Sequence, residues 1–277
     1  MSTVDVPVPV VPVQAGDAGA VLERLRRQAP LVQCLTNVVV TGFTANALLA
    51  VGASPAMVEE PEEAGELARV ADGVLVNVGT VSESTAAAMR AAAQGAHAAG
   101  TPWVLDPVAV GPLTFRTRLA TELLTKGPAV VRGNPSEVLS LAGATGSARG
   151  VDSATDSASA LAPAVELARR EGTTVAVSGT VDYITDGDSA VEVATGDPMM
   201  TRVTGVGCVL GALVAACSAV EESPLVAAGA ATVILTVAAE VAAERSPGPG
   251  TFAVALLDAL YTLDPKTLDV HLAARSA

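Results

Sequence analysis

The sequence predicts one α/β domain with a largely parallel central sheet covered by helices on both faces. Short apolar runs of strand length alternate with longer Ala-rich runs of helix length along the 277 residues, a pattern typical of strand–helix–strand units. The strand-length runs are almost wholly apolar, which indicates burial on both sides of the sheet. Half the residues are hydrophobic but only 2% are aromatic, and a core of Ala, Val and Leu suits close packing of helices on a sheet.

The N-terminal half is expected to supply three buried strands and the helices between them. Residues 1–18 alternate Val with Pro and carry no Lys or Arg, so we predict a disordered or extended tail, not a signal peptide, before a single domain at 19–277. Pro61, followed by Glu62 and Glu63, suits the start of a helix. The other predicted helices are Val21–Ala29, Phe43–Val51 and Ser82–Ala99; the strands are Leu31–Leu35, Gly73–Gly79 and Trp103–Pro107, with an extended piece at Ser54–Val58.

The C-terminal half continues with two more buried strands, Ala129–Asn134 and Thr174–Gly179. Asn134 is positioned to cap the helix that follows, with Glu137 in its first turn. Gly187-Asp188 between two short runs predicts a β-hairpin. The remaining elements are a loop at Ala144–Ser159, hairpin strands at Asp182–Asp186 and Ser189–Ala194, and helices at Pro135–Leu141, Ala160–Arg170, Gly207–Val220, Pro224–Glu244 and Phe252–Leu260, the last two separated by Gly248-Pro249-Gly250.

Charge and cysteine content argue against several functional classes. A net charge of −13 disfavours nucleic acid and anionic membrane surfaces as partners. The three cysteines form neither a disulfide framework nor a zinc pattern, which indicates a reducing, cytoplasmic compartment, and Cys34 and Cys217 are predicted to be packing residues. Two charge-free runs, Val203–Val220 and Ser223–Ala239, approach membrane-spanning length but are rich in Gly, Ala and Thr, so we predict a buried helical pair.

A Gly-rich turn leads directly into an apolar helix at Val203–Val214. Gly205 and Gly207 leave out two side chains, so the backbone N–H groups from Gly205 through Val206 to Cys208 can approach an anion closely. The positive end of the helix dipole points at the same spot, which favours phosphate and lowers the pKa of a thiol in the first turn. The alternative for this stretch alone is a turn that enters a buried helix, with Cys208 as a small core residue.

Polar side chains end the predicted strands. The carboxyl ends of parallel strands gather at one edge of the sheet, where ligands bind, so these side chains are expected to face the Gly205 turn. Arg132 can neutralise phosphate oxygens. Asp106, Asn134 and Glu137 can hold Mg²⁺ directly or through water. The combination suits ATP chemistry without a P-loop or dinucleotide-binding motif. The strand-end residues are Asn37, Asn77, Asp106, Arg132, Asn134 and Ser178.

Several motifs, in order, resemble those of the hydroxyethylthiazole kinase family, over roughly Leu31 to Leu260. The resemblance implies a ribokinase-like three-layer α/β sandwich. It also implies ATP-dependent, Mg²⁺-assisted phosphorylation of the primary alcohol of 4-methyl-5-(2-hydroxyethyl)thiazole, a thiamine-salvage step, by a homotrimer with sites at subunit interfaces. The motifs are Cys34–Asn46, Gly52–Met57, Asp106–Val108, Arg132–Glu137, Val203–Cys208 and Gly248–Phe252.

The resemblance also implies roles for individual residues. Cys208 stands where related kinases have a catalytic Asp, and two roles stay open: a thiolate base for the alcohol proton, or a residue that shapes the site. The implied thiazole contacts are Met57, Gly205 and Asn37; the ATP contacts are Arg132, Ser178 and Asn134; the metal ligands are Asp106 and Glu137; the catalytic turn is Gly205, Val206, Gly207 and Cys208.

Two alternatives remain on the sequence. One is another ribokinase-like kinase of small alcohols, such as a hydroxymethylpyrimidine kinase; the other is a non-catalytic nucleotide-binding protein of the same fold. The chain departs from the family pattern at a few positions that bear on selectivity and nucleotide affinity: Val206, Ser178, Arg202 and Asp197.

Overall fold

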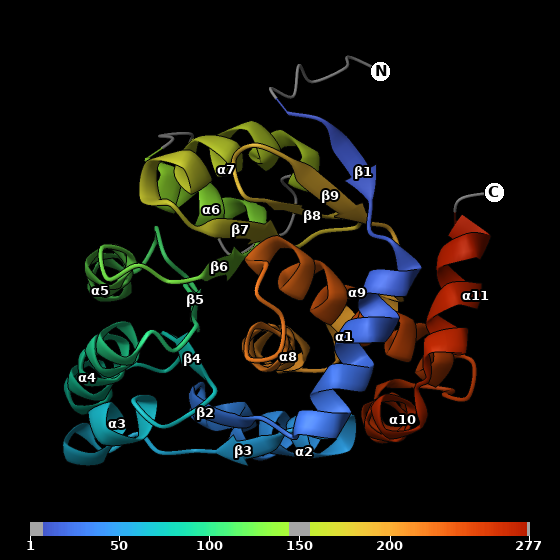
Figure 1. Cartoon of the computed structure of the whole chain (residues 1–277), viewed down its shortest axis with the longest axis horizontal. Coiled ribbons are helices and arrows are strands. Elements are labelled where there is room, and N and C mark those ends of the chain that lie inside the picture. Colours follow the sequence, from blue (N-terminus) through green and yellow to red (C-terminus); the bar gives the residue numbers. More distant parts are fainter. Residues whose placement is uncertain (1–7, 144–155, 276–277) are drawn as a thin grey trace.

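The computed structural model describes residues 8–143 and 156–275. Their strands form one nine-stranded sheet in the order β1-β9-β8-β7-β6-β5-β4-β2-β3 (Figure 1). All neighbouring strands are parallel except the pairs β7–β8 and β8–β9. The strands are β1 Val10–Pro12, β2 Leu31–Leu35, β3 Ser54–Ala56, β4 Gly73–Asn77, β5 Trp103–Asp106, β6 Val130–Gly133, β7 Thr174–Val177, β8 Asp182–Thr185 and β9 Ala190–Val193.

Helices cover both faces of the sheet, which confirms the predicted three-layer arrangement (Figure 1). One face carries α3 Pro61–Ala68, α4 Glu83–Ala99, α5 Thr114–Leu124, α6 Pro135–Ala142 and α7 Ser157–Glu171. The other face carries α1 Ala15–Gln28, α2 Thr41–Val51, α8 Val206–Ser218, α9 Pro224–Ala243 and α10 Pro249–Thr262, with α11 Pro265–Arg275 packed against α1 and α9.

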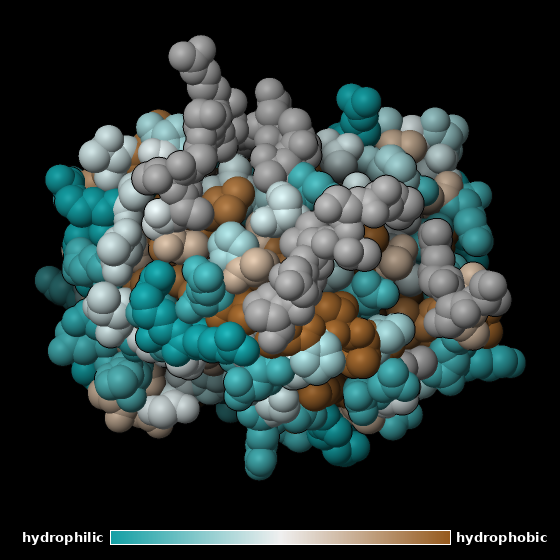
Figure 2. All heavy atoms as spheres, turned by 90° about the horizontal axis from the view of Figure 1, so that it is seen from above, coloured by the Kyte–Doolittle hydropathy of each residue, from teal (hydrophilic) through white to brown (hydrophobic). Residues whose placement is uncertain are grey.

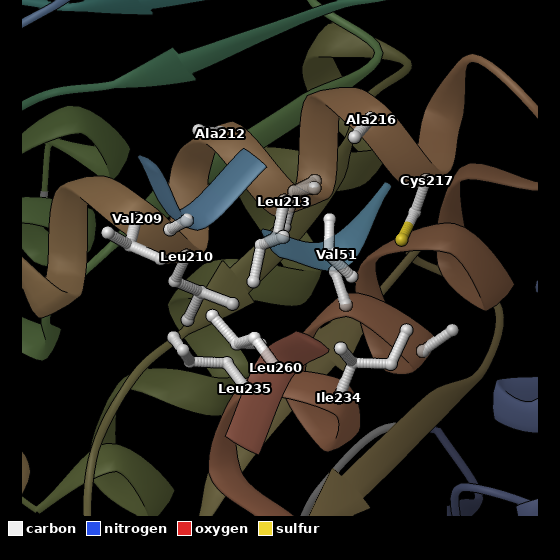
Figure 3. Close-up of a cluster of buried hydrophobic side chains, with 14 of the residues drawn as sticks. Val51, Val209, Leu210, Ala212, Leu213, Ala216, Cys217, Ile234, Leu235 and Leu260 are labelled. Atoms are coloured by element: carbon white, nitrogen blue, oxygen red, sulfur yellow. The ribbon is translucent and has the colours of Figure 1, made fainter. Parts of the chain in front are cut away.

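Helix α8 lies at the centre of the second face, and its position depends on a glycine. An added Cβ at Gly73, the first residue of β4, would lie 2.5 Å from the carbonyl oxygen of Ala215. The missing side chain lets α8 lie directly against the sheet. Figure 3 shows Leu213 and Cys217 of α8 among side chains of α2, α9 and α10. Cys217 and Cys34 are both buried, as predicted for packing residues.

The apolar C-terminal runs form core helices. Among the described residues, only α9 is long and apolar enough to span a bilayer, and 78% of its apolar window is buried inside the protein. Its hydrophobic sequence is therefore explained by contacts with α1, α8 and α10. On the face seen in Figure 2, hydrophobic residues gather near the centre and hydrophilic residues cover much of the periphery.

Some predicted boundaries were wrong. Helix α1 begins at Ala15 instead of Val21, inside the predicted tail. Val10–Pro12 of that tail is extended, one of the two conformations predicted, but it also forms β1, which pairs in parallel with β9. Neither the pairing of three residues with a distant edge strand nor a helix start without a side-chain cap leaves a clear local signal. The loop predicted at Ala144–Ser159 lies outside the described residues as far as 155, and α7 begins at Ser157.

Two helices were missed. Helix α5 buries Leu119 and Leu123 on one face, and this spacing of four residues was a usable helical signal. Helix α11 begins at a proline, which is a helix-start signal, and buries Leu268.

Candidate active site

The structure brings the predicted strand-end residues together at one edge of the sheet. Asn77 ends β4 and Asp106 ends β5, and the two residues are register partners. The side-chain Nδ2 of Asn77 donates to Oδ2 of Asp106 at 2.7 Å and to Sγ of Cys208 at 3.4 Å. Asn77 therefore connects two strands to the first turn of α8, a role that the sequence did not suggest.

The Gly-rich turn forms the N-terminus of α8. Gly205 is the N-cap, with a left-handed φ of +92° and, as a glycine, no side chain to cap the helix. An added Cβ there would lie 2.6 Å from Cγ1 of Val40, so both the dihedral angle and the close contact require glycine. The helix begins at Val206, and the first N–H to reach back to Gly205 O belongs to Val209. The preceding N–H groups point out of the helix, where an anion can bind.

Arg132 connects the sheet to this helix start. Its Nη2 donates to Oγ of Ser178 at 2.8 Å, and its Nη1 donates to the carbonyl oxygen of Gly207 at 3.2 Å and lies 3.8 Å from Oδ2 of Asp106. The side chain is only 13% exposed. Within the described residues, Nε of Arg132 is buried without a hydrogen-bond partner. A buried, unpaired donor on a cation beside a helix N-terminus favours an anionic ligand.

Asp106 is the buried carboxylate of the site. Burial raises its pKa to about 7, the Arg132 charge and the Asn77 hydrogen bond lower it, and the Glu137 charge raises it further. Its Oδ1 is buried and has no partner in the described part of the chain. An orphaned carboxylate oxygen in such a place fits a cation.

Glu137 and Asn134 have structural tasks that the metal prediction did not include. Oδ1 of Asn134 accepts from the N–H of Glu137, while Oε2 of Glu137 accepts from the N–H of Asn134, which completes the predicted cap of α6. Oε1 of Glu137 accepts from the N–H of Ala109 at 2.8 Å. No group of three His, Cys, Asp or Glu residues suited to a metal occurs within 8–143 and 156–275, so a full protein cage for Mg²⁺ is not formed there.

The expected lowering of the Cys208 pKa is wrong. Burial raises the pKa of this thiol to about 11, and the Asp106 carboxylate raises it further against the opposing effects of Arg132 and hydrogen bonds. The residue does lie in the first turn of α8, as predicted. The helix dipole acts there, but desolvation and a neighbouring negative charge both disfavour the thiolate.

A pocket of about 660 Å³ lies beside the Arg132–Gly207 contact. It brings together the three residues predicted to contact ATP and two of the catalytic turn, and its size suits a small-molecule ligand. Sequence reasoning missed its other walls, although Thr236 in the mostly apolar α9 was a signal. The predicted residues in the lining are Arg132, Asn134, Ser178, Val206 and Gly207; the unpredicted ones include Asp156, Asp182, Thr195, Gly196, Met200 and Thr236.

The residues predicted at the thiazole do not line this pocket. Asn37 accepts from the N–H of Val39 and lies near Gly79, where an added Cβ would be 3.1 Å from Nδ2 of Asn37. Met57 follows β3 and is half-buried against the core. The loop that carries Asn37 also brings Val40 against Gly205, so this loop lies beside the Gly205 turn.

Asp182 at the wall of the pocket gives a pH-dependent prediction. Burial raises its pKa to about 6, from an ordinary value of 3.8, despite the N–H of Gly179 donating to its Oδ1 at 2.9 Å. Folding therefore favours the protonated form, and this stabilisation, complete below about pH 4, is lost as the pH rises through 6. We expect Asp182→Asn to raise the free energy of unfolding by about 1–2 kcal/mol at pH 8, and by much less at pH 4. Urea denaturation without ligand, at one protein concentration, measures the difference in the free energy of unfolding between variant and wild type at each pH. Equal differences at the two pH values would contradict the prediction.

The fold and the arrangement of Arg132, Asp106 and the Gly205 turn define an α/β protein whose site suits a phosphate-bearing small molecule. In agreement, a solved ribokinase-like superfamily protein from Enterococcus faecalis shares the fold at 14% identity, with a TM-score of 0.65, over 92% of this chain and 97% of that one.

The comparisons also identify the family. The model of the hydroxyethylthiazole kinase family matches residues 22–266, and the chain belongs to this family. It is 54% identical to the hydroxyethylthiazole kinase of Pectobacterium atrosepticum, over 92% of this chain and 96% of the relative. It is 56% identical to that of Cutibacterium acnes, over 88% of each. The solved hydroxyethylthiazole kinase protein from Pyrococcus horikoshii superposes with a TM-score of 0.84 at 41% identity, covering 90% of this chain and 94% of that one.

Proposed function

We propose that the protein transfers the γ-phosphoryl group of ATP to the primary hydroxyl of 4-methyl-5-(2-hydroxyethyl)thiazole, a step of thiamine salvage. The observation that carries the proposal is the junction of Arg132 with the N-terminus of α8, beside a pocket of about 660 Å³, in a chain of this family. No observation favours the hydroxymethylpyrimidine alternative.

The two substrates approach the catalytic turn from opposite sides. ATP occupies the pocket lined by Arg132, Asn134 and Ser178, so its terminal phosphate reaches the open N–H groups of α8. The thiazole alcohol lies on the side of Asn37 and Met57, with Gly205 between the two ligands. In phosphoryl transfer the negative charge on the equatorial oxygens must be held in place, and Arg132 together with the helix N-terminus supplies this stabilisation.

The residues present fit a magnesium ion that has few protein ligands. Mg²⁺ keeps several waters and is bound through one or two carboxylates and the substrate phosphates. Asp106 would hold it, since its buried Oδ1 lacks a partner among the described residues. Both oxygens of Glu137 already accept N–H groups, so Glu137 would act through water. When bound, the ion supplies positive charge to the transferring phosphate.

Cys208 serves to shape the site in this proposal. A loose phosphoryl-transfer transition state needs little help from a base, and burial disfavours the thiolate. We therefore expect Cys208→Ser to keep kcat within about tenfold of wild type, because the hydroxyl still accepts a hydrogen bond from Asn77. Steady-state rates from pH 7 to 9 measure this; a loss of more than about a hundredfold would instead assign the proton transfer to a thiolate.

The chain is proposed to act as a single domain within a cytoplasmic homotrimer whose sites lie at subunit interfaces. Val38 and Val39, next to Asn37, are each 67% exposed, and Leu49 of α2 is 58% exposed. Exposed aliphatic side chains beside an open substrate side suit coverage by a second copy of the chain. Sedimentation at several protein concentrations tests the trimer, and a monomer with full activity would contradict it.

The direct test mixes the purified protein with ATP, Mg²⁺ and one alcohol at a time, with mass spectrometry of the products. We expect the phosphate ester of the thiazole. Turnover of a hydroxymethylpyrimidine alone would point to the alternative kinase. ATP binding without phosphorylation of either alcohol would point to a non-catalytic nucleotide-binding protein.

A further inference from the structure

Two hydrogen bonds tie one wall of the pocket to α9. The hydroxyls of Thr195 and Thr236 lie 2.7 Å apart, and the N–H of Gly196 donates to Oε1 of Glu240 at 2.9 Å. Thr236 and Glu240 are four residues apart, so they project from the same face of the helix on successive turns. The segment that follows β9 is therefore hydrogen-bonded to a single face of α9.

Gly196 is the point at which this chain turns into the pocket wall. Its φ of +128° is left-handed, and the 3₁₀ helix Pro198–Arg202 follows at once. Oδ1 of Asp197 accepts from the N–H of Met199 and caps that short helix. The wall from Thr195 to Thr201 supplies six of the residues that line the pocket. The hydrogen bond from the N–H of Gly196 to Oε1 of Glu240 therefore determines the position of this wall.

The second oxygen of Glu240 is held by the C-terminal helix. Nδ1 of His271 in α11 lies 2.6 Å from Oε2 and donates to it, and the two side chains are only 21% and 13% exposed. Helix α11 is itself packed against α1 and α9. A continuous set of contacts therefore runs from α11 through one carboxylate to the turn at Gly196.

We propose that Glu240 is a positioning residue for the nucleotide: its carboxylate holds the Gly196 turn so that the Thr195–Thr201 wall fits ATP, and His271 orients that carboxylate. Glu240 does not line the pocket itself, so it acts through Gly196 and not by contact with ATP. The inference rests on the proposed function, because it takes ATP as the occupant of this pocket.

Glu240→Ala tests the proposal by its separate effects on the two substrates. Loss of a charge-assisted hydrogen bond at the wall is expected to raise KM for ATP and its Kd, measured by calorimetry, by about tenfold. The KM for the thiazole alcohol should stay within about twofold, since Met57 and Asn37 do not line this pocket. Glu240→Gln can still accept from Gly196 and is expected to restore most of the affinity for ATP, and His271→Ala should give an intermediate increase.

Glu244→Ala is the matched control. Glu244, the C-cap of α9, lies one turn beyond Glu240 and borders the same shallow hollow as Gly196 and His271. In the described part of the chain no hydrogen bond joins its carboxylate to the wall, in contrast to Glu240. Its kinetics should match wild type. Thermal unfolding of every variant separates a loss of stability from a loss of ATP affinity.

The proposal is overturned if folded Glu240→Ala binds ATP as wild type does, or if its two KM values rise together. If Glu240→Ala does not fold, His271→Ala decides: an increase in KM for ATP alone supports the proposal, and no change overturns it. Failure of the proposed function gives a different result, because wild type would then bind no ATP or phosphorylate no alcohol, and Arg132→Ala would change nothing.

Discussion

Replacing Arg132 with alanine is expected to lower kcat/KM for ATP by about a hundredfold to a thousandfold, the usual loss when a charged group stops stabilising a transition state. The guanidinium holds Ser178, reaches Gly207 at the start of α8, and lies 3.8 Å from Asp106. The substitution removes the positive charge nearest to the proposed phosphate position and leaves the buried Asp106 without its cation. Steady-state kinetics at varied ATP, with saturating thiazole alcohol, measure the loss.

Two comparisons make this test specific. Arg132→Lys keeps the charge but cannot make both hydrogen bonds from a planar fork, so it should recover only part of the rate. Ser178→Ala removes one partner of Nη2 and should cost about tenfold or less. Thermal unfolding checks that Arg132→Ala remains folded. An unchanged kcat/KM for ATP would show that the pocket beside Arg132 is not the nucleotide site.

Gly205→Ala is expected to abolish measurable activity and to lower the free energy of unfolding by about 2–4 kcal/mol. Alanine disfavours the left-handed φ of +92° at this N-cap, and its Cβ would lie 2.6 Å from Cγ1 of Val40. The turn must shift to relieve the contact, and the N–H groups at the start of α8 shift with it. Urea denaturation and the coupled ATP assay measure the two losses.

Gly248→Ala controls for the change of glycine to alanine at a helix N-cap. Gly248 caps α10 with an extended backbone, and an added Cβ there meets no atom within 4 Å. We expect stability within about 1 kcal/mol of wild type and full activity. Wild-type activity of Gly205→Ala would mean that the geometry of the turn is not needed for phosphoryl transfer.

Much of the fold was predictable because buried parallel strands have a strong sequence pattern. The run Leu31–Leu35 is β2 with the same bounds, and the Gly187-Asp188 turn joins β8 and β9 as predicted. The edge strand β1 was not predicted, because a strand of three residues that pairs with a distant strand is too short to show a hydrophobic period. The same holds for the site. The polar residues at the strand ends were predicted, whereas the pocket wall formed by α9 and the Gly196 turn was not.

The sequence alone was enough to predict the central strands β2 and β4 to β7, the polar residues at the strand ends and the glycine turn at Gly205, because each depends on local pattern and on the geometry of a parallel sheet. The chemical properties of those residues, in contrast, depend on the folded structure. Burial beside Asp106 raised the pKa of Cys208, which its place on the helix had predicted to be lowered. The backbone N–H groups of Ala109 and Asn134 donate hydrogen bonds to the two carboxylate oxygens of Glu137. Hydrogen bonds and desolvation depend on neighbours distant in the chain, and only folding brings those neighbours together.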